Sequence, residues 1–234
     1  MNQTSIKSGV ALAALAGGMI FLGGSSGSAR SVPAAAVPAP AVDNPLAAKP
    51  GEEVAVFAGG CFWGIQAVYQ HVKGVKSAVS GYTGGDVASP SYHEVSSGTT
   101  GHAEAVRVVF DPSKVSYGTL LRVFFSVAHD PTQLNRQGPD VGTQYRSEIF
   151  FANAAQKKIA AAYMTQLGNA KTFSGPIATR LSGLGKFTVA EDYHQNYANE
   201  HPNEPYIRFN DAPKVAALKT DLPAIYKEEL SAWK

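Results

Sequence analysis

The chain has 234 residues, of which 44% are hydrophobic and 16% are charged. So few charges exclude a disordered acidic or basic protein, and the length suits one folded domain with extensions. Lysine and arginine number 20 against 18 aspartate and glutamate, and a net charge of +2 lacks the basic excess typical of nucleic-acid binding. Cys61 is the single cysteine, which excludes an internal disulfide, a dithiol pair and a cysteine-rich zinc site.

The first 29 residues have the pattern of a signal peptide. Lys7 supplies a positive charge, an apolar run follows over residues 9–24, and Gly27 to Ala29 form a small-residue cleavage site. The run is short for a membrane span, although an uncleaved anchor and a buried helix remain alternatives. The pattern predicts an exported protein, periplasmic or secreted, which is tethered to a membrane if the signal stays uncleaved.

A linker is predicted over residues 30–51. Its prolines favour extended, polyproline-like backbone and oppose an alanine-rich helix, so we expect it to stand apart from the core as a tether. The folded domain is predicted over residues 52–234. The prolines of the linker are Pro33, Pro38, Pro40, Pro45 and Pro50.

Strands and helices alternate along the folded domain. Period-two patterning and strand-forming residues predict strands over residues 53–58, 75–82, 102–110, 144–152 and 186–190. Apolar residues at helical spacing predict helices over 61–70, 116–128, 154–167 and 214–217, with a Gly- and Pro-rich loop over 129–143. This succession predicts an α/β protein built as an α+β two-layer sandwich, with a mixed sheet flanked by helices and a long C-terminal coil segment.

Cys61 follows Gly59 and Gly60 at the predicted start of a helix. The positive end of the helix dipole and its free N–H groups favour a thiolate, so this position predicts a lowered pKa for the Cys61 thiol. The glycines allow a tight turn that leaves the sulfur open to approach. The alternative is a small, buried, inert side chain. The presence of one oxidisable thiol in an exported protein favours a catalytic role for Cys61.

Four further kinds of side chain could surround such a thiol, and each has an ordinary structural alternative. Phe62 and Trp63 could belong to the core or could form an apolar pocket for a methyl or thioether group. Glu104, at the start of a strand, could be solvated or could face that pocket with a raised pKa and donate a proton. The hydroxyl groups of Tyr92 and Tyr145 could be buried donors or could line a polar corner of the site.

Six motifs, in order along residues 52 to 210, resemble the peptide methionine sulfoxide reductase A family. Each motif alone is moderate evidence, and six in register are specific. They are Gly60-Cys61-Phe62-Trp63-Gly64, Gly81-Tyr82-Thr83-Gly84-Gly85, Gly98-Thr99-Thr100-Gly101-His102-Ala103-Glu104, His129-Asp130-Pro131-Thr132-Gln133, residues 138–147 (Gly-Pro-Asp-Val-Gly-Thr-Gln-Tyr-Arg-Ser) and Ala190-Glu191-Asp192-Tyr193-His194-Gln195.

The resemblance implies an oxidoreductase that reduces the S epimer of methionine sulfoxide, free or in proteins, and so repairs oxidised proteins. Residues 52–234 would be its catalytic domain. Cys61 matches the family nucleophile and Glu104 the family acid. Five other residues match substrate contacts: Tyr92 and Tyr145 for the sulfoxide oxygen, Phe62 and Trp63 for the S-methyl group, and Asp140 as a loop carboxylate near the site.

The chain departs from many family members in lacking extra cysteines near its C-terminus. Reduction of the substrate would leave Cys61 as a sulfenic acid, which only a thiol from another molecule could reduce. We therefore expect an external reductant, such as a thioredoxin- or glutaredoxin-like protein or a small thiol. No metal or organic cofactor is implied, and a monomer is expected. His194 and Asp192 could brace the C-terminal segment over the site.

Two other classes of function remain open from the residues alone. Cys61 could pair with His102 or His194 in a cysteine hydrolase that performs acyl transfer. The chain could also be an exported binding module that recognises oxidised peptides through Phe62 and Trp63 without turning them over. An esterase or amidase assay distinguishes a hydrolase from a reductase. Turnover of a methyl sulfoxide distinguishes a reductase from a binding module.

Overall fold

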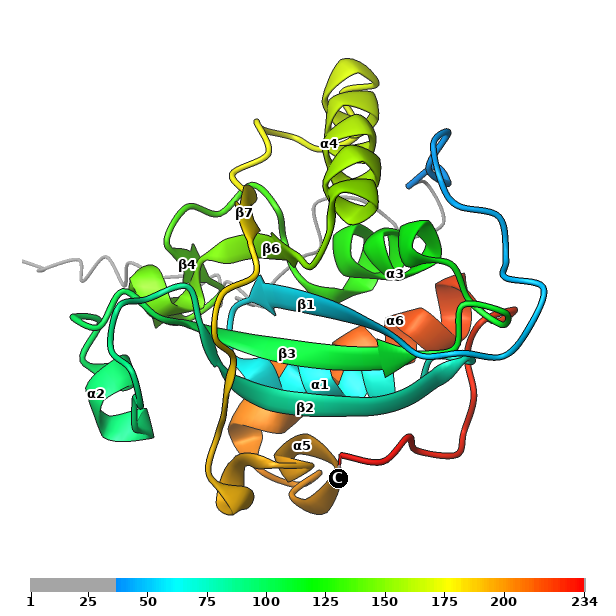
Figure 1. Ribbon diagram of the computed structural model, residues 1–234. Helices are drawn as coiled ribbons and strands as arrows, with labels where there is room; N and C mark the ends of the chain where they lie inside the picture. Colours follow the sequence, from blue (N-terminus) through cyan, green and yellow to red (C-terminus); the bar gives the residue numbers. More distant parts are fainter. Residues whose placement is uncertain (1–36, 234) are drawn as a thin grey trace, which may run out of the picture.

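A computed structural model describes residues 37–233, and a six-stranded mixed sheet forms its centre (Figure 1). The strands lie in the order β7-β6-β1-β3-β2-β8. All neighbours are antiparallel except β6 and β7, which are parallel. The predicted mixed sheet with flanking helices is therefore confirmed. The strands are β1 (Glu53–Gly59), β2 (Val75–Thr83), β3 (Ala103–Phe110), β6 (Ser147–Phe151), β7 (Arg180–Gly183) and β8 (Thr188–Val189), while β4 (Arg136–Gln137) and β5 (Asp140–Val141) pair separately.

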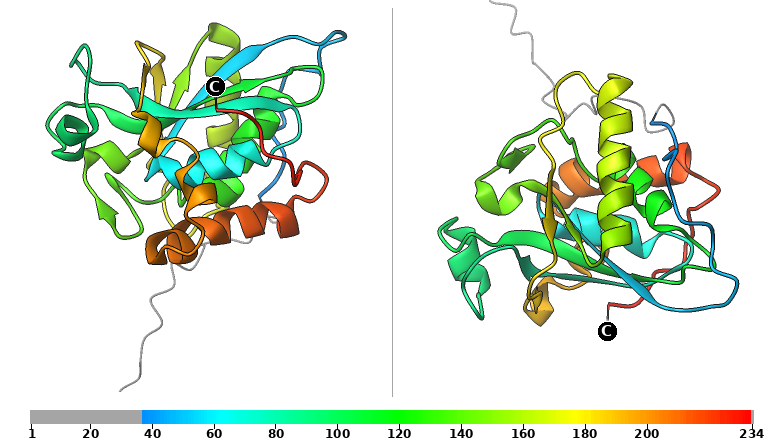
Figure 2. Two further views of the ribbon diagram at one scale, coloured as in Figure 1. Left: turned by 90° about the horizontal axis from the view of Figure 1, so that it is seen from below. Right: turned by 45° about the horizontal axis from the view of Figure 1, so that its top comes forward.

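Helices cover one face of this sheet. In the left view of Figure 2, α1 lies between the sheet and α6, so α6 forms an outer layer. Two π-helical segments, Phe124–Ala128 and Ile207–Asp211, extend α3 and precede α6. The helices are α1 (Phe62–Gln70), α2 (Tyr92–Ser96), α3 (Tyr117–Val123), α4 (Ala154–Asn169), α5 (Tyr197–Glu200) and α6 (Ala212–Asp221).

The two faces of β1 are both buried, which explains its nearly continuous apolar sequence. On the helical face, Phe57 stacks between Tyr69 of α1 and Phe124, each with ring centroids 5.1 Å away. On the other face, Val56 belongs to a smaller apolar cluster that Phe187 helps to cover. The chain around residues 180–190 crosses this face in front of β1, β3 and β2 (Figure 1). Burial on both faces fixes β1 firmly, and with it the residue that follows β1.

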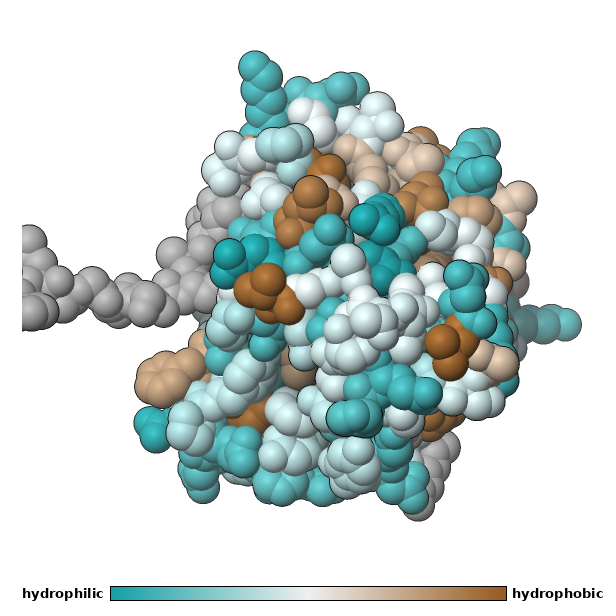
Figure 3. Space-filling model, turned by 90° about the vertical axis from the view of Figure 1, so that its left-hand side faces the viewer, coloured by the Kyte–Doolittle hydropathy of each residue, from teal (hydrophilic) through white to brown (hydrophobic). Residues whose placement is uncertain are grey.

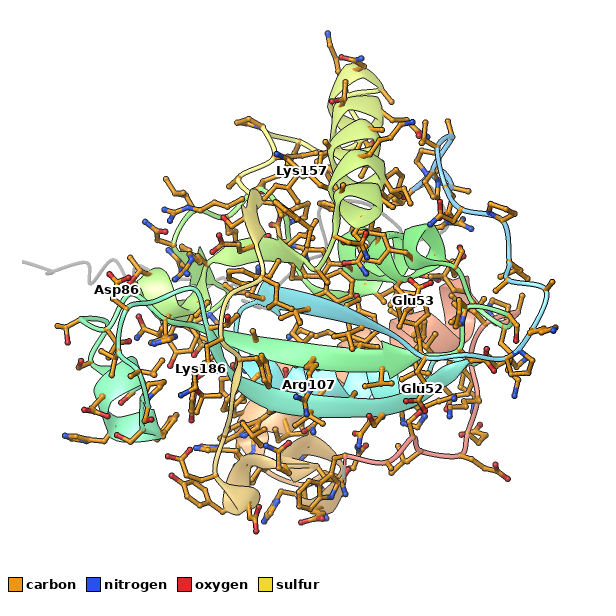
Figure 4. All side chains as sticks on the ribbon, in the orientation of Figure 1. Glu52, Glu53, Asp86, Arg107, Lys157 and Lys186 are labelled. Atoms are coloured by element: carbon orange, nitrogen blue, oxygen red, sulfur yellow. The ribbon has the colours of Figure 1, made fainter. Side chains whose placement is uncertain are left out.

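Arg107 of β3 shows how the crossing segment is held. Its side chain projects from the sheet toward the viewer in Figure 4, and its guanidinium carbon lies 5.2 Å from the ring centroid of Phe187. Lys186 Nζ donates a hydrogen bond to the carbonyl oxygen of Ala88 at 2.5 Å. The crossing segment therefore contacts both the sheet and the loop before α2.

Several predicted elements differ from the observed ones. The strand predicted over 144–152 begins only at Ser147, because Thr143–Tyr145 form a turn of 3-10 helix. The strand predicted over 186–190 is reduced to Thr188–Val189, and the short helix predicted over 214–217 extends over Ala212–Asp221. No helix is predicted from the sequence at α2, whose capping box joins Ser91 and Glu94.

Residues 37–51 pack against the domain, contrary to the expectation of a free tether. Val37 is 1% exposed and lies in the core. Tyr163 donates a hydrogen bond to the carbonyl oxygen of Pro38 at 2.6 Å. The carboxylate of Asp43 accepts hydrogen bonds from Ser116 Oγ at 2.5 Å and from the N–H of Gly118 at 2.9 Å. Proline-rich backbone lacks internal hydrogen bonds, and here polar groups of the domain satisfy it.

The predicted signal peptide lies outside the described residues, as do residues 30–36 of the predicted linker. Across residues 37–233, the helices are all too short or too polar to span a bilayer.

Candidate active site

Cys61 stands where β1 ends and α1 begins, at the N-cap position of α1. The chain turns there through Gly60, whose φ of +97° is a conformation that favours glycine. A Cβ atom at residue 60 would also lie 2.6 Å from the side chain of Gln137. The predicted strand, glycine turn and helix are therefore observed, and they place the thiol at the first turn of α1.

Cys61 is 8% exposed and reaches solvent through a small cavity of about 170 Å³. The cavity is lined by all seven residues to which the family resemblance assigns a role in catalysis or substrate binding, together with an eighth. It lies at the end of the sheet towards which β1 runs, the side that faces the viewer in Figure 3. On that face, hydrophobic groups are separated by hydrophilic ones. The lining residues are Cys61, Phe62, Trp63, Tyr92, Glu104, Asp140, Tyr145 and Tyr206.

Glu104 points from β3 into this cavity and is only 2% exposed. Its Oε2 accepts a hydrogen bond from the N–H of Phe62 at 3.0 Å, at the first turn of α1. Burial raises the pKa of Glu104 to about 8, and this effect outweighs the hydrogen bond, which favours the ionised form. The Glu104 carboxyl group is therefore mainly protonated at pH 7 and can donate a proton.

The Cys61 thiol is less acidic than predicted. Burial raises the pKa of Cys61 well above its ordinary value, and the carboxylates of Glu104 and Asp211 add to that effect. The hydrogen bond from the N–H of Trp63 lowers the pKa, as expected at a helix start, but desolvation is larger. The predicted low pKa is thus wrong for the protein without substrate, because the sulfur lies inside the protein.

An aromatic wall surrounds the sulfur. Phe62 is 1% exposed, while Trp63 is half-buried and stacks on Tyr197 with ring centroids 4.0 Å apart. Trp63 Nε1 donates a hydrogen bond to Nδ1 of His194 at 3.2 Å. The His194 ring lies 4.3 Å from the ring of Tyr92. The wall is therefore held from behind by the C-terminal segment, and it offers an apolar surface suited to a methyl group.

Phenols and a carboxylate form the polar side of the cavity. Burial raises the pKa of Tyr92 and of Tyr145, and the nearby Glu104 adds to both shifts, so both hydroxyl groups stay protonated. Tyr206 donates a short hydrogen bond to Oδ2 of Asp140. Three phenolic O–H groups thus line the same small cavity as the Glu104 acid.

Tyr206 is a residue of the cavity that the sequence does not predict. It occupies the C-terminal segment, which carries no strand or glycine motif to mark it, and it enters the site only because that segment folds back over α1. Its hydrogen bond to Asp140 positions the loop carboxylate that the resemblance implied.

The two histidines considered as partners of Cys61 serve other contacts. His102 accepts a hydrogen bond from the N–H of Gly85 and bonds the carbonyl oxygen of Val87 at 2.8 Å, so it holds a loop. Nδ1 of His194 accepts from Trp63, and Asp192 is exposed. Neither histidine lines the Cys61 cavity, so the site lacks the Cys-His pair that acyl transfer requires.

A buried thiol, a protonated carboxyl group and phenolic hydroxyls around one apolar cavity define a thiol-dependent reductase for a neutral substrate that carries an oxygen atom. The donors can stabilise and protonate that oxygen while the sulfur is attacked.

Comparison with known proteins identifies the class more closely. The family model described as peptide methionine sulfoxide reductase matches residues 53–224. A peptide methionine sulfoxide reductase MsrA 2 of Mesorhizobium japonicum is 58% identical over 78% of this chain and 93% of its own length. The MsrA of Deinococcus radiodurans is 50% identical over 75% of this chain and 86% of its own length.

Two solved structures share the fold. Reduced Mxr1 of Saccharomyces cerevisiae has a TM-score of 0.60 at 32% identity, covering 70% of this chain and 92% of its own. Methionine sulfoxide reductase A of Corynebacterium diphtheriae has a TM-score of 0.58 at 36% identity, covering 67% of this chain and 78% of its own. The chain belongs to the peptide methionine sulfoxide reductase family. It is an oxidoreductase that reduces methionine sulfoxide to methionine.

Proposed function

We propose that Cys61 is the nucleophile of this reduction, Glu104 its acid, and Tyr92 and Tyr145 the donors that bind the sulfoxide oxygen. The observation that carries the proposal is that all four groups line one cavity of about 170 Å³, in which Glu104 is held protonated by burial. Phe62 and Trp63 receive the S-methyl group. Asp140, which accepts the hydrogen bond of Tyr206, contacts the substrate at the polar side.

The reaction transfers the oxygen atom from the substrate sulfur to Cys61. The sulfur of Cys61 attacks the sulfoxide sulfur while Glu104 protonates the sulfoxide oxygen, which is otherwise a poor leaving group. The attack forms a bond between the two sulfur atoms. This bond and the S–O bond of the substrate then break as the hydroxyl group passes to the Cys61 sulfur, and the thiol proton restores Glu104. Two electrons pass from Cys61 to the substrate, so the products are methionine and a sulfenic acid on Cys61.

An external thiol reduces this sulfenic acid. Cys61 is the single cysteine of the 234 residues, which supports attack by a thiol from another molecule rather than from the same chain. The first thiol forms a mixed disulfide and releases water, and a second thiol releases Cys61 and leaves the reductant oxidised. A thioredoxin- or glutaredoxin-like protein, or a small thiol, has the required chemistry.

A single turnover without reductant tests the proposed chemistry. One equivalent of methionine per protein is expected from the S epimer of methionine sulfoxide. Intact-mass and peptide analysis should then show one added oxygen atom on Cys61. A reagent that traps sulfenic acids should react with this oxidised form of Cys61. The R epimer serves as the matched control and should remain unreacted. Disulfide-linked dimers as the main product, or equal consumption of both epimers, would contradict the proposal.

We also propose that the protein is exported by residues 1–29. Lys7, the apolar run over residues 9–24 and the small residues at Gly27 to Ala29 support a signal peptide that is cleaved after Ala29. In an exported protein the thiol reductant would be periplasmic or extracellular. N-terminal peptide mass spectrometry of the protein from its native host should find Arg30 as the first residue. A retained Met1 in a soluble cytoplasmic fraction would contradict export.

A further inference from the structure

Asp211 is a fully buried carboxylate that no step of the proposed reaction uses. It ends the π-helical segment Ile207–Asp211, and its side chain is 0% exposed. Its Oδ1 accepts a hydrogen bond from Lys214 Nζ at 3.1 Å, whereas its Oδ2 has no hydrogen-bond partner within the part of the chain described. A buried carboxylate with an unpartnered oxygen is costly, so its retention needs a reason.

The Asp211–Lys214 ion pair packs against the first turn of α1. A Cβ atom at Gly64 would lie 2.1 Å from Oδ1 of Asp211 and 2.9 Å from Nζ of Lys214. Because residue 64 is a glycine and has no side chain, the ion pair can lie directly against the surface of α1, three residues after Cys61. Lys214 is largely covered there, with 16% of its side chain exposed, so its charge is poorly screened by water.

The charges around the thiol come from four elements. Glu104 on β3 and Asp140 on β5 line the cavity, together with the phenols of Tyr92, Tyr145 and Tyr206. Asp211 and Lys214 face α1 from the C-terminal segment. Asp211 raises the pKa of Cys61, and Lys214 lowers it. Since Glu104 is mainly protonated below pH 8, the Asp211–Lys214 pair supplies fixed charges that lie against the first turn of α1.

We propose that Lys214 is a positioning residue for the reduction, held against α1 by Asp211 so that its ammonium group stabilises negative charge on the Cys61 sulfur. Such charge develops on the thiolate before attack and on the sulfenate after it. Asp211 keeps the ammonium group from turning to solvent and at the same time limits its effect. The inference rests on the proposed role of Cys61 as nucleophile.

The rate of Cys61 alkylation by iodoacetamide, followed against pH, measures this effect without any turnover of substrate. Lys214→Met is expected to move the alkylation profile to higher pH and to slow alkylation at pH 7 about three- to tenfold. Asp211→Asn is expected to move the alkylation profile to lower pH, because the substitution removes the negative charge of Asp211 and leaves the positive charge of Lys214. Lys214→Arg should restore most of the original profile. The kcat for methionine sulfoxide at pH 7 should fall with Lys214→Met and be largely restored with Lys214→Arg.

Lys219→Met is the matched control, since it makes the same substitution in α6 at an exposed residue that pairs with Glu228. It should leave the profile unchanged. Shifts in opposite directions support the proposal, because an ion pair with only a structural role would affect both variants in the same way. Loss of thermal stability in both variants without opposed shifts would overturn it. Since alkylation does not require turnover, a failure here leaves the nucleophile assignment to be judged by Cys61→Ser.

Discussion

Replacing Cys61 with serine is expected to abolish methionine sulfoxide reduction, by a factor on the order of 10³ or more. A serine hydroxyl is a far weaker nucleophile than a thiol, and its oxygen cannot be oxidised to the equivalent of a sulfenic acid. The measurement is methionine formation with dithiothreitol as the reductant. No reductant should rescue the variant, because the defect precedes regeneration.

The Cys61→Ser variant also separates a reductase from a binding module. Phe62, Trp63 and the phenols remain in place, so the variant should still bind a methionine sulfoxide peptide, as titration calorimetry can show. Its fold should persist, since serine is slightly smaller than cysteine. Residual turnover within tenfold of the unsubstituted protein would remove Cys61 from the mechanism.

Replacing Glu104 with glutamine is expected to lower kcat about 10²- to 10³-fold, because glutamine cannot protonate the sulfoxide oxygen. The amide oxygen can still accept the hydrogen bond from the N–H of Phe62, so KM should change little. Glu52→Gln is the matched control, because Glu52 is exposed at the opposite end of the sheet (Figure 4). Loss of activity in both variants, or in neither, would contradict the role of Glu104.

The pH dependence gives a second measure of Glu104. Because burial raises its pKa to about 8, kcat should fall as the pH rises through about 8, when the acid loses its proton. In the unfolded chain, Glu104 ionises at its ordinary, lower pKa. Between that pKa and the folded-state pKa of about 8, the folded protein therefore binds one proton more than the unfolded chain. Stability should therefore fall as the pH rises from about 5 to about 8. Glu104→Gln should remove this decline in urea unfolding and be the more stable protein above pH 7.

Local sequence determined much of this protein. Glu53–Gly59 and Phe62–Gln70 carry strand and helix patterns of their own, and the glycines between them impose the turn that puts Cys61 at the start of α1. The motif residues could be assigned to one site because the family resemblance brought Glu104, Tyr92 and Tyr145 together with Cys61. Composition alone excluded an internal disulfide, since one cysteine cannot form one.

Tertiary structure decided the chemical state of the site. The sequence places a helix dipole at Cys61, but only burial beneath the C-terminal segment makes desolvation the larger effect on its pKa. Tyr206 and Asp211 carry no local signal, and they reach the site because the π-helical segment folds against α1. Likewise, Val37 enters the core because α3 and α4 offer partners for proline-rich backbone. Dielectric surroundings and long-range contacts arise only from the packed chain, so local periodicity cannot encode them.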